Sequence, residues 1–472
     1  MKVYHYRNIE TALLEISNGT FHFSSIEELN DPLEGDVNVY WKADKAAWEG
    51  LFCTYGISLF KSILNYFLEK YVKFNQNERA RHIIKGEDQF TVIATKFDFS
   101  KELDSIYNAI LNLPTVNKIT NYCCYQNQNK KILRSVLIIF LYFVHLDIIR
   151  LCIKHLDSHG IMQQDDYDKT IDRIDRKSEF TKTARDRFLD LLSSNMDVTD
   201  VTNIFDNTYI QSFKVDFLSD LNLLLSLKQD INIFNNSKQW FNLETDYPII
   251  FVDEISKLIF PESYVTCFST SCNNSAMWGN YAHSHRGVCL IYEWSDSKKI
   301  LEDPSFASQI CCQEVVYNGD PLECNFFDYL HNFSREDLKL LLTGKNANLS
   351  SLFKTYVQLN KNDTLYKSFY ETKSFRKLKY WSYENEYRIA LFNKGTSSIP
   401  IENRNFKFHY NILKGVIFGI NTSYYDKFRI VKSLKDLKDQ LPQDFKVYQA
   451  YFDDNTHSLA TVEINFRELL DK

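Results

Sequence analysis

The first forty residues predict a strand, a helix, a second strand and a turn, in that order. Residues 3–7 alternate with the period of a strand, so that His5 and Arg7 share one side of it. Apolar residues then recur at helical spacing as far as Gly19, a typical helix stop. A short strand follows, and the sequence LNDPLEG at residues 29–35 predicts a tight turn because Asp-Pro disfavours a helix.

From residue 41 to residue 250 the apolar residues recur mostly at helical spacing. Four stretches show this period: residues 59–74, 131–155, 182–194 and 216–227. One strand is predicted at residues 90–95. The most apolar run, Val136–Val144, is too short for a bilayer, which needs about 20 residues, and charged residues flank it. We therefore expect a buried helix, no membrane association, and a mostly helical insertion over residues 41–250.

Short apolar segments with strand character return towards the C-terminal part of the chain. They are residues 249–252, 264–268, 288–294, 314–317, 386–392, 415–420 and 446–452. Residues 326–379 predict two helices separated near Gly344. The predicted fold class is α+β. A small mixed or antiparallel sheet core with flanking helices is formed by residues 1–40 and 251–472, and the helical insertion interrupts it.

Composition narrows the setting. The chain has 472 residues and a formal net charge of −6, so a nucleic-acid target would need a local basic patch. A protein target remains equally open. The N-terminal residues lack the apolar core of a signal peptide, and the ten cysteines are expected to be reduced thiols. A cytoplasmic bacterial protein fits these features.

One candidate site lies in CFSTSCNNSAMWGNYAHSHRGVCLIY, from Cys267 to Tyr292. The pattern predicts a strand, a helix, a tight turn and a strand, with Ser269, Tyr281 and His285 placed to face a ligand. The alternative is that the aromatic residues belong to the core and that His285 caps the helix. A zinc site formed by the two histidines and the nearby cysteines is not expected, because the spacing matches no common zinc module.

A second candidate site lies in KYWSYENEYRIAL, residues 379–391. On a strand Glu384, Glu386 and Arg388 would share one face, with neighbours about 6.6 Å apart. The arginine would keep both carboxylates ionised, and such a pair beside aromatic rings can bind ribose hydroxyls and stabilise an oxocarbenium ion. The alternative is an exposed strand with a charged outer face.

Several motifs occur in a distinctive order: YHYR, LNDPLEG, MWGNYAHSHRGVCLIY, VVYNGDP, WSYENEYRI and KGVIFGI. In this order they resemble the uncharacterised bacterial family catalogued as domain of unknown function 2971, over residues 1–40 and 255–430. Members of that family often lie among stress and phage-defence genes. The resemblance therefore implies an effector of antiviral defence that acts by abortive infection.

The order of the motifs also resembles, more loosely, that of ADP-ribosyltransferases. This resemblance implies NAD as the substrate, bound by residues of the first strand and of the segment that follows the middle strand. The implied residues are His5 or Arg7 to grip NAD, Ser269 with Tyr281 to brace the nicotinamide ribose, and Glu386 supported by Glu384 to stabilise the oxocarbenium ion.

Three hypotheses about function remain open. The first is an ADP-ribosyltransferase or an NAD-hydrolysing enzyme, in which His5, Tyr281, His285 and Glu386 must converge on one cleft. The second is a hydrolase or nuclease that uses the same carboxylates, with or without a divalent metal. The third is a non-catalytic sensor, in which the helical insertion binds a partner and the old site is only structural. An apolar groove on the insertion, with Glu384 and Glu386 buried in salt bridges, would favour it.

Overall fold

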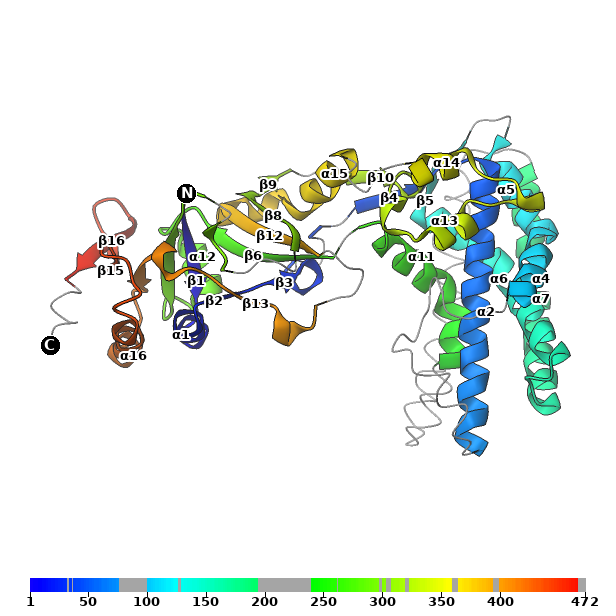
Figure 1. Cartoon of the computed structure of the whole chain (residues 1–472), viewed down its shortest axis with the longest axis horizontal. Helices are drawn as coiled ribbons and strands as arrows, with labels where there is room; N and C mark the ends of the chain where they lie inside the picture. The colour runs from blue at the N-terminus through cyan, green and yellow to red at the C-terminus, as the bar shows by residue number, and fades with distance from the viewer. Residues whose placement is uncertain are drawn as a thin grey trace. The chain divides into compact units, whose positions relative to one another are not determined.

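The computed structural model describes most of the chain, and it divides into two compact units (Figure 1). The described residues are 1–31, 34–35, 37–75, 100–125, 129–193, 239–260, 262–296, 299–302, 307–318, 322–358, 364–393 and 399–465. The sheet unit comprises Met1–Val37, Pro261–Leu322 and Thr364–Lys472, and the helical unit comprises Asn38–Phe260 and Glu323–Asp363. The strand predicted at residues 90–95 and the helix predicted at 216–227 lie outside the described residues.

The two units and the predicted domains differ most at Glu323–Asp363, which belongs to the helical unit. Two contacts explain this. Strand β10 (Leu322–Asn325) lies beside β4 (Val37–Trp41), and helix α13 (Arg335–Leu341) packs on the long helix α2 (Lys45–Asn75). The predicted break near Gly344 is confirmed, since Arg335–Leu341 and Ser351–Gln358 form separate helices, but the described residues of 326–379 form three helices and not two. The chain there also forms several 3-10 turns, and the first of these contains the buried aromatic residues Phe326 and Phe327.

The sheet unit contains one mixed sheet of nine strands, which confirms the predicted α+β class. The strand order is β16-β15-β14-β7-β1-β6-β12-β8, and β3 pairs with β6. Only β14 and β15 run parallel among the pairs described in this sheet. The strands are β1 Lys2–Arg7, β3 Ser24–Ser25, β6 Ser263–Ser269, β7 Val288–Glu293, β8 Ala307–Glu314, β12 Glu386–Asn393, β14 Leu413–Phe418, β15 Lys446–Asp453 and β16 Ser458–Ile464.

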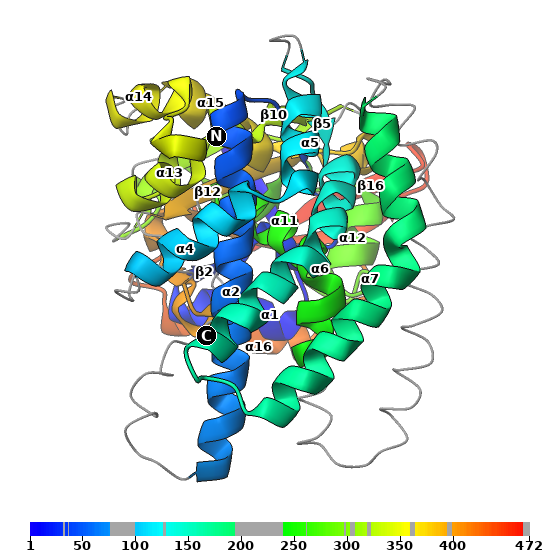
Figure 2. The same cartoon turned by 90° about the vertical axis from the view of Figure 1, so that its right-hand side faces the viewer.

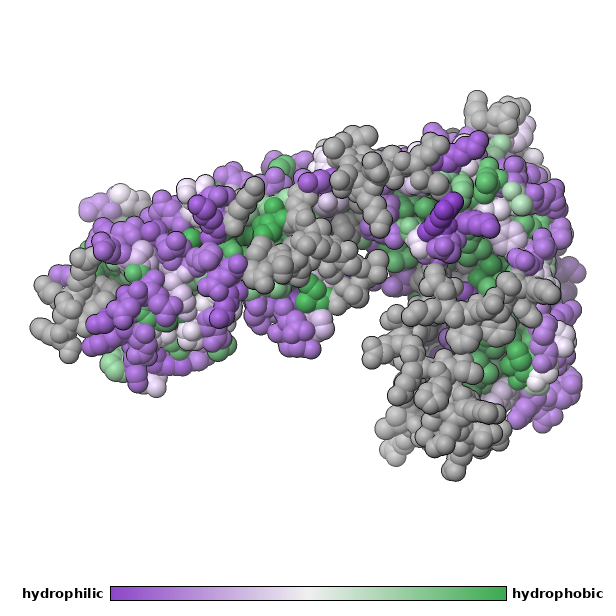
Figure 3. Space-filling view, in the orientation of Figure 1, coloured by the Kyte–Doolittle hydropathy of each residue, from purple (hydrophilic) through white to green (hydrophobic). Residues whose placement is uncertain are grey.

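Helices cover both faces of this sheet. Helix α1 (Ile9–Asn18) contacts α16 (Tyr424–Asp436) over the larger apolar face, while α12 (Ser275–Tyr281) and α15 (Thr364–Ser374) lie on the opposite face. The space-filling view shows a mostly hydrophilic surface around α16, β15 and β16 (Figure 3). The sheet is therefore a buried layer, and a polar side chain inside it needs a partner.

Smaller elements complete the sheet unit. Strands β2 (Thr20–His22) and β13 (Asn405–Lys407) pair with each other, as do β9 (Val316–Tyr317) and β11 (Arg376–Lys377). The 3-10 turns of the two units are Ile26–Glu28, Phe326–Asp328, Leu330–Asn332, Lys345–Ala347, Lys379–Glu384 (η8), Ile401–Asn403 and Tyr410–Ile412.

In the helical unit α6 is the central helix of a bundle, and it contacts α2, α4, α5, α7 and α11 (Figure 2). The bounds are α4 Ser100–Leu111, α5 Pro114–Cys123, α6 Arg134–Ser158, α7 Gln164–Ser193, α11 Tyr247–Lys257 and α14 Ser351–Gln358, with a two-residue strand β5 at Ile132–Leu133 and a π-helical segment at Asn242–Asp246. The strand predicted at residues 249–252 is wrong. These residues lie in α11, where Pro248 starts the helix and Phe251 and Ile255 are buried at helical spacing.

Two described helices are long and apolar enough to cross a membrane, namely α6 and residues 45–71 of α2. The most apolar window of α6 is 67% buried in the bundle, and that of α2 is 78% buried. The run Val136–Val144 lies within α6, so it is a mostly buried helix as predicted. A central position explains why α6 is apolar on all sides.

Candidate active-site cleft

The sheet is interrupted at its centre, between β1 and β6. Strand β1 pairs with β7 along its whole length but pairs with β6 only at Tyr4 and Ser269. Beyond that pair β6 is joined by β3 instead, with Val265 opposite Ser24. The split forms a cavity of about 500 Å³. This volume lies within the range of roughly 300–1,000 Å³ that is typical of small-molecule sites.

Side chains from both faces of the sheet reach this cavity because the two strands separate. Opposite residues of antiparallel strands share a face, so Ser269 and Glu386 lie on one side. His5 and Arg7 lie on the other side, where the His5 ring packs 4.5 Å from the ring of Phe268 between centroids. Seven of the eight predicted site residues line the cavity, and His285 is the exception.

Glu384 reaches the cavity by a turn and not along a strand. It ends the 3-10 turn η8, and β12 begins only at Glu386. Asn385, between them, has a left-handed backbone with φ of 45°. The prediction that Glu384, Glu386 and Arg388 alternate along one strand is therefore wrong for Glu384, since left-handed Asn385 interrupts the extended chain.

The serine–threonine run holds this turn in place. The hydroxyl of fully buried Ser269 donates a hydrogen bond to the carbonyl oxygen of Glu384 at 2.7 Å. The backbone N–H of Thr270 donates to the carbonyl oxygen of Asn385 at 2.8 Å. The hydroxyl hydrogen of Ser269 is therefore already used in a hydrogen bond within the protein. This bond fixes the backbone of Glu384.

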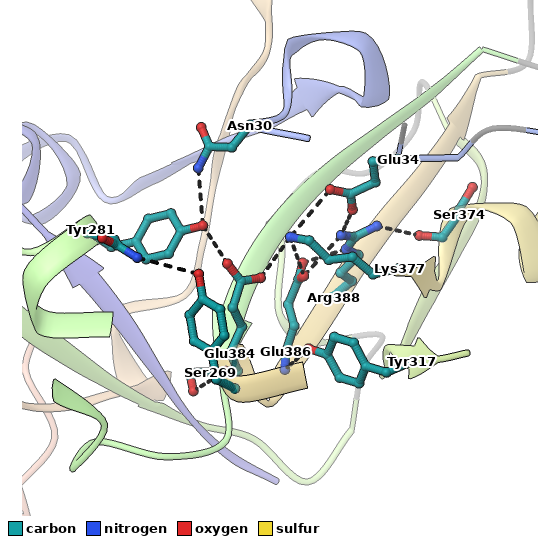
Figure 4. A network of polar contacts seen from close by, with 12 residues as sticks. Asn30, Glu34, Ser269, Tyr281, Tyr317, Ser374, Lys377, Glu384, Glu386 and Arg388 are labelled. Atoms are coloured by element: carbon teal, nitrogen blue, oxygen red, sulfur yellow. Dashed lines mark hydrogen bonds and ion pairs between the residues drawn. The ribbon is translucent and has the colours of Figure 1, made fainter. Parts of the chain in front are cut away.

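Lys377 joins three carboxylates at one side of the cavity (Figure 4). Its Nζ lies 2.7 Å from Glu384, 3.3 Å from Glu34 and 3.4 Å from Glu386. Lys377 is on β11, Glu34 is in the turn after β3, and the other two carboxylates flank Asn385. All four side chains are buried, so each charge needs the others.

Arg388 is the second cation of the network, and it is fully buried. Its Nε contacts Glu386 at 2.5 Å, a second nitrogen contacts Glu34, and a third donates to the carbonyl oxygen of Ser374 at 2.8 Å. The alternative of an exposed strand with a charged outer face is therefore wrong. A guanidinium with this number of partners fixes the turn, α15 and β12 around the cavity.

Burial also changes the acidity of the network. Burial raises the pKa of Glu386 above its usual value, although Lys377 acts in the opposite direction. Burial would lower the pKa of Lys377, but Glu386 and Glu384 outweigh it, so the pKa of this ammonium is raised. Formally the three carboxylates exceed the two cations by one negative charge.

The hydroxyl of Tyr281 connects the carboxylate network to Asn30. Its hydroxyl donates to Glu384 at 2.6 Å and accepts from the amide of Asn30 at 3.1 Å. Burial and the charge of Glu384 raise the pKa of Tyr281, so the phenol stays neutral. Helix α12 carries Tyr281, and its N-cap residue Asn274 also donates to the carbonyl oxygen of Tyr383.

A second polar network lies at the opposite side of the cavity, around Glu15. One carboxylate oxygen is 2.8 Å from His5 Nδ1 and 2.7 Å from the Tyr292 hydroxyl, and the other is 2.8 Å from Arg7 Nε. Burial lowers the pKa of His5, assisted by the charge of Arg7, so the imidazole is neutral at pH 7. We assign the Nδ1 proton to the bond with Glu15, which leaves Nε2 as a hydrogen-bond acceptor.

His285 does not take part in the cleft. Helix α12 ends at Tyr281, and His283, Ser284 and His285 follow with three successive left-handed backbones. The prediction that His285 faces the ligand together with Tyr281 is therefore wrong, and the ring of His285 instead stacks on that of Trp278 at 6.2 Å. Across the described residues no group of three His, Cys, Asp or Glu side chains is placed to hold a metal ion.

The sequence reading missed Lys377 and Glu15. Nothing in the local pattern distinguished Lys377, which lay in a segment expected to be helical. Glu15 had a signal, since it lies beside Ile16 on the buried side of α1, whereas the apolar Leu14 is 62% exposed. A charged residue at a core position of an amphipathic helix indicates a buried partner.

With this geometry described, comparisons with known proteins add one result. The family model described as "Protein of unknown function (DUF2971)" matches residues 277–389. The matched segment contains Tyr281, Lys377, Glu384, Glu386 and Arg388, and the predicted resemblance to this family is confirmed over that range. No curated protein and no solved structure matches the chain.

Proposed function

We propose that this cleft is the active site of an NAD-using enzyme, which either hydrolyses NAD or transfers its ADP-ribose to an acceptor. The observation that carries the proposal is that two buried titratable networks face one cavity, and that each contains a group whose pKa is displaced by burial. Burial raises the pKa of Glu386 and lowers the pKa of His5. Buried titratable groups with displaced pKa values that face one cavity are typical of functional sites.

The charge balance supports a cationic substrate group near the carboxylates. The excess of one formal negative charge among Glu34, Glu384 and Glu386 over Lys377 and Arg388 suits the positive nicotinamide ring. When the bond from ribose to nicotinamide breaks, its electron pair leaves with neutral nicotinamide. The positive charge moves to the ribose, where ionised carboxylates stabilise it.

Residues on the other side of the cavity supply the remaining roles. Arg7, whose side chain is 24% exposed, is available for the diphosphate of the substrate. His5 Nε2 accepts the proton of the attacking water or acceptor hydroxyl, while Glu15 holds the ring and stabilises the imidazolium that forms. The neutral imidazole is therefore the proposed base.

The metal-dependent hydrolase is less well supported, because Lys377 and Arg388 already occupy the carboxylates that a metal would need. The non-catalytic sensor keeps one supporting observation, the burial of Glu384 and Glu386 in ion pairs. In the sensor hypothesis the helical insertion binds a partner and the cleft is only structural. Turnover therefore separates the two alternatives.

The test is to incubate the purified full-length chain with NAD and to quantify nicotinamide by chromatography. We expect release by the wild type and about a hundredfold slower release by Glu386→Gln, which keeps the shape but loses the charge. Glu10→Gln, an exposed carboxylate on α1, is the matched control and should release nicotinamide at the wild-type rate. Absence of nicotinamide release by the wild type would support the sensor instead.

For the cell, we propose action in the bacterial cytoplasm as an effector of antiviral defence. Expression of the wild type should then slow growth and deplete NAD, and expression of Glu386→Gln should not. Equal growth of the two strains at equal protein levels would contradict this role.

A further inference from the structure

The helical unit has its own cavity, of about 290 Å³, on the side where α2 and α7 approach the residues before the π-helical segment. Aromatic rings form its wall. The Trp240 ring lies 5.2 Å from the ring of Tyr66 and 5.6 Å from that of Phe67, between centroids. Trp240 is 8% exposed and Phe67 is 2% exposed, whereas Tyr66 is half-buried. Tyr66 therefore offers the accessible ring.

Four cationic side chains also line this cavity: Lys70, Lys169, Arg173 and Arg176. The last three are spaced four and three residues apart on α7, so they share one face of that helix. Asp172 is the single carboxylate among the described lining residues. The lining is thus strongly cationic although the whole chain is acidic.

Two of these cations, Arg173 and Lys70, are held in place by ion pairs with carboxylates outside the cavity lining. Arg173 contacts Glu244 at 2.6 Å, and the side chain of Glu244 is fully buried in the π-helical segment. Lys70 contacts Asp166 at 2.6 Å, and the Tyr71 hydroxyl donates to the same carboxylate at 2.9 Å. Segments of π-helix occur frequently at functional sites. A buried carboxylate that fixes an arginine at a cavity wall is a feature of a built site.

The other two cations, Lys169 and Arg176, are less strongly paired. Lys169 makes no ion pair with any described residue, and the pair of Arg176 with Asp172 is open to solvent on both sides, at 74% and 67% side-chain exposure. Exposed pairs of this kind are weak and are easily exchanged for a better anion. An incoming phosphate can therefore be bound by Lys169 and Arg176 at little cost.

We propose that this cavity binds a nucleotide, with its base stacked on Tyr66 and its phosphates at Lys169 and Arg176. Stacking on aromatic rings beside positive charge is the general basis of nucleotide and base recognition. The volume of about 290 Å³ is close to the lower end of the range for small-molecule sites, roughly 300 Å³. A net charge of −6 disfavours a long polyanion, whose approach depends on an extended positive surface.

The test is ADP binding to the full-length chain, measured by isothermal titration calorimetry. Lys169→Gln and Arg176→Gln should each weaken ADP binding roughly tenfold, the loss expected for one charge-assisted phosphate contact. Tyr66→Leu should weaken ADP binding by a similar factor and leave the binding of inorganic phosphate unchanged. Lys182→Gln, an exposed lysine further along α7, is the matched control and should bind ADP like the wild type.

Three results would overturn the proposal. The first is the absence of ADP binding to the wild type at millimolar concentration. The second is equal ADP affinity of the wild type and the Lys169, Arg176 and Tyr66 variants, which would place the ligand elsewhere. The third is binding of oligonucleotides but not of ADP, which would make this face a nucleic-acid surface. Circular dichroism of each variant checks that the helices remain folded.

Discussion

At the scale of single residues, burial decides what the charged side chains of the sheet unit do. Arg388 and Glu15 lie inside the protein, on opposite faces of the same sheet, and each has three described polar partners. Neither could stay there alone, because an isolated buried charge costs many kcal/mol. Each has therefore become part of a network that also lines the cleft or positions a residue that lines it.

Replacing Arg388 by methionine should destabilise the sheet unit strongly. The variant leaves Glu34 and Glu386 buried without their guanidinium partner, which costs about 3–5 kcal/mol. Urea unfolding measures the loss. Arg429→Met is the control, because Arg429 binds Glu10 through two nitrogens but on the surface, where no measurable change is expected. Equal midpoints for the two variants would contradict the network.

Glu15 predicts an acid-sensitive contribution to stability. Burial raises its pKa, but His5 and Arg7 outweigh burial and lower the pKa from 4.5 to about 2. The unfolded chain then binds the proton first, so this stability is complete above pH 4.5 and is lost as the pH falls towards 2. Between about pH 5 and pH 3 the wild type should lose roughly 2 kcal/mol more than Glu15→Gln. Parallel pH profiles of unfolding for the two proteins would refute this.

At the scale of elements, local signals predicted the strands and helices that are fixed by their own sequence. Helix α1 ends at Gly19 as its sequence indicated, with Gly19 in a left-handed conformation. The errors arose where contacts distant in sequence decide the conformation. Residues 249–252 are apolar enough for a strand but are helical because the bundle buries one side of α11, and Glu384 leaves the strand because Asn385 turns the chain.

The cap of helix α12 lies close to the cleft. Removing it therefore tests whether this helix positions the site as well as stabilising the fold. Asn274→Ala removes the cap of α12 and the contact with Tyr383, next to Glu384, so it should cost about 1 kcal/mol and also reduce NAD turnover. Ser423→Ala removes the cap of α16 on the far side of the sheet and should cost a similar amount without affecting turnover. Equal turnover of the two variants would show that the α12 cap does not position the site.

At the scale of the whole molecule, the sequence predicted an α+β protein with a helical part, and seven of its eight candidate site residues line the cleft. It could not show that β1 and β6 separate, because strand pairing depends on residues more than 250 positions apart, such as Tyr4 and Ser269. The split brings His5 and Glu386 to one cavity from opposite faces. Burial, charge balance and the role of Lys377 follow only from that geometry.

The burial of α2 and α6 in the helical unit predicts how the protein behaves with membranes. Although α6 and α2 have the length and composition of membrane spans, 67% and 78% of their apolar windows are buried in the helical unit. We therefore expect the full-length chain to stay in the supernatant when it is sedimented with liposomes, whether these are neutral or anionic. Co-sedimentation that survives high salt would contradict this expectation.

The most direct test of the central claim is a crystal structure of the full-length chain with ADP-ribose, the product of NAD hydrolysis. The account predicts that the ligand lies in the split between β1 and β6, with a ribose hydroxyl about 3 Å from a carboxylate of Glu384 or Glu386 and the diphosphate near Arg7. Ligand density elsewhere on the sheet unit, or an empty cleft at saturating ADP-ribose, would contradict it.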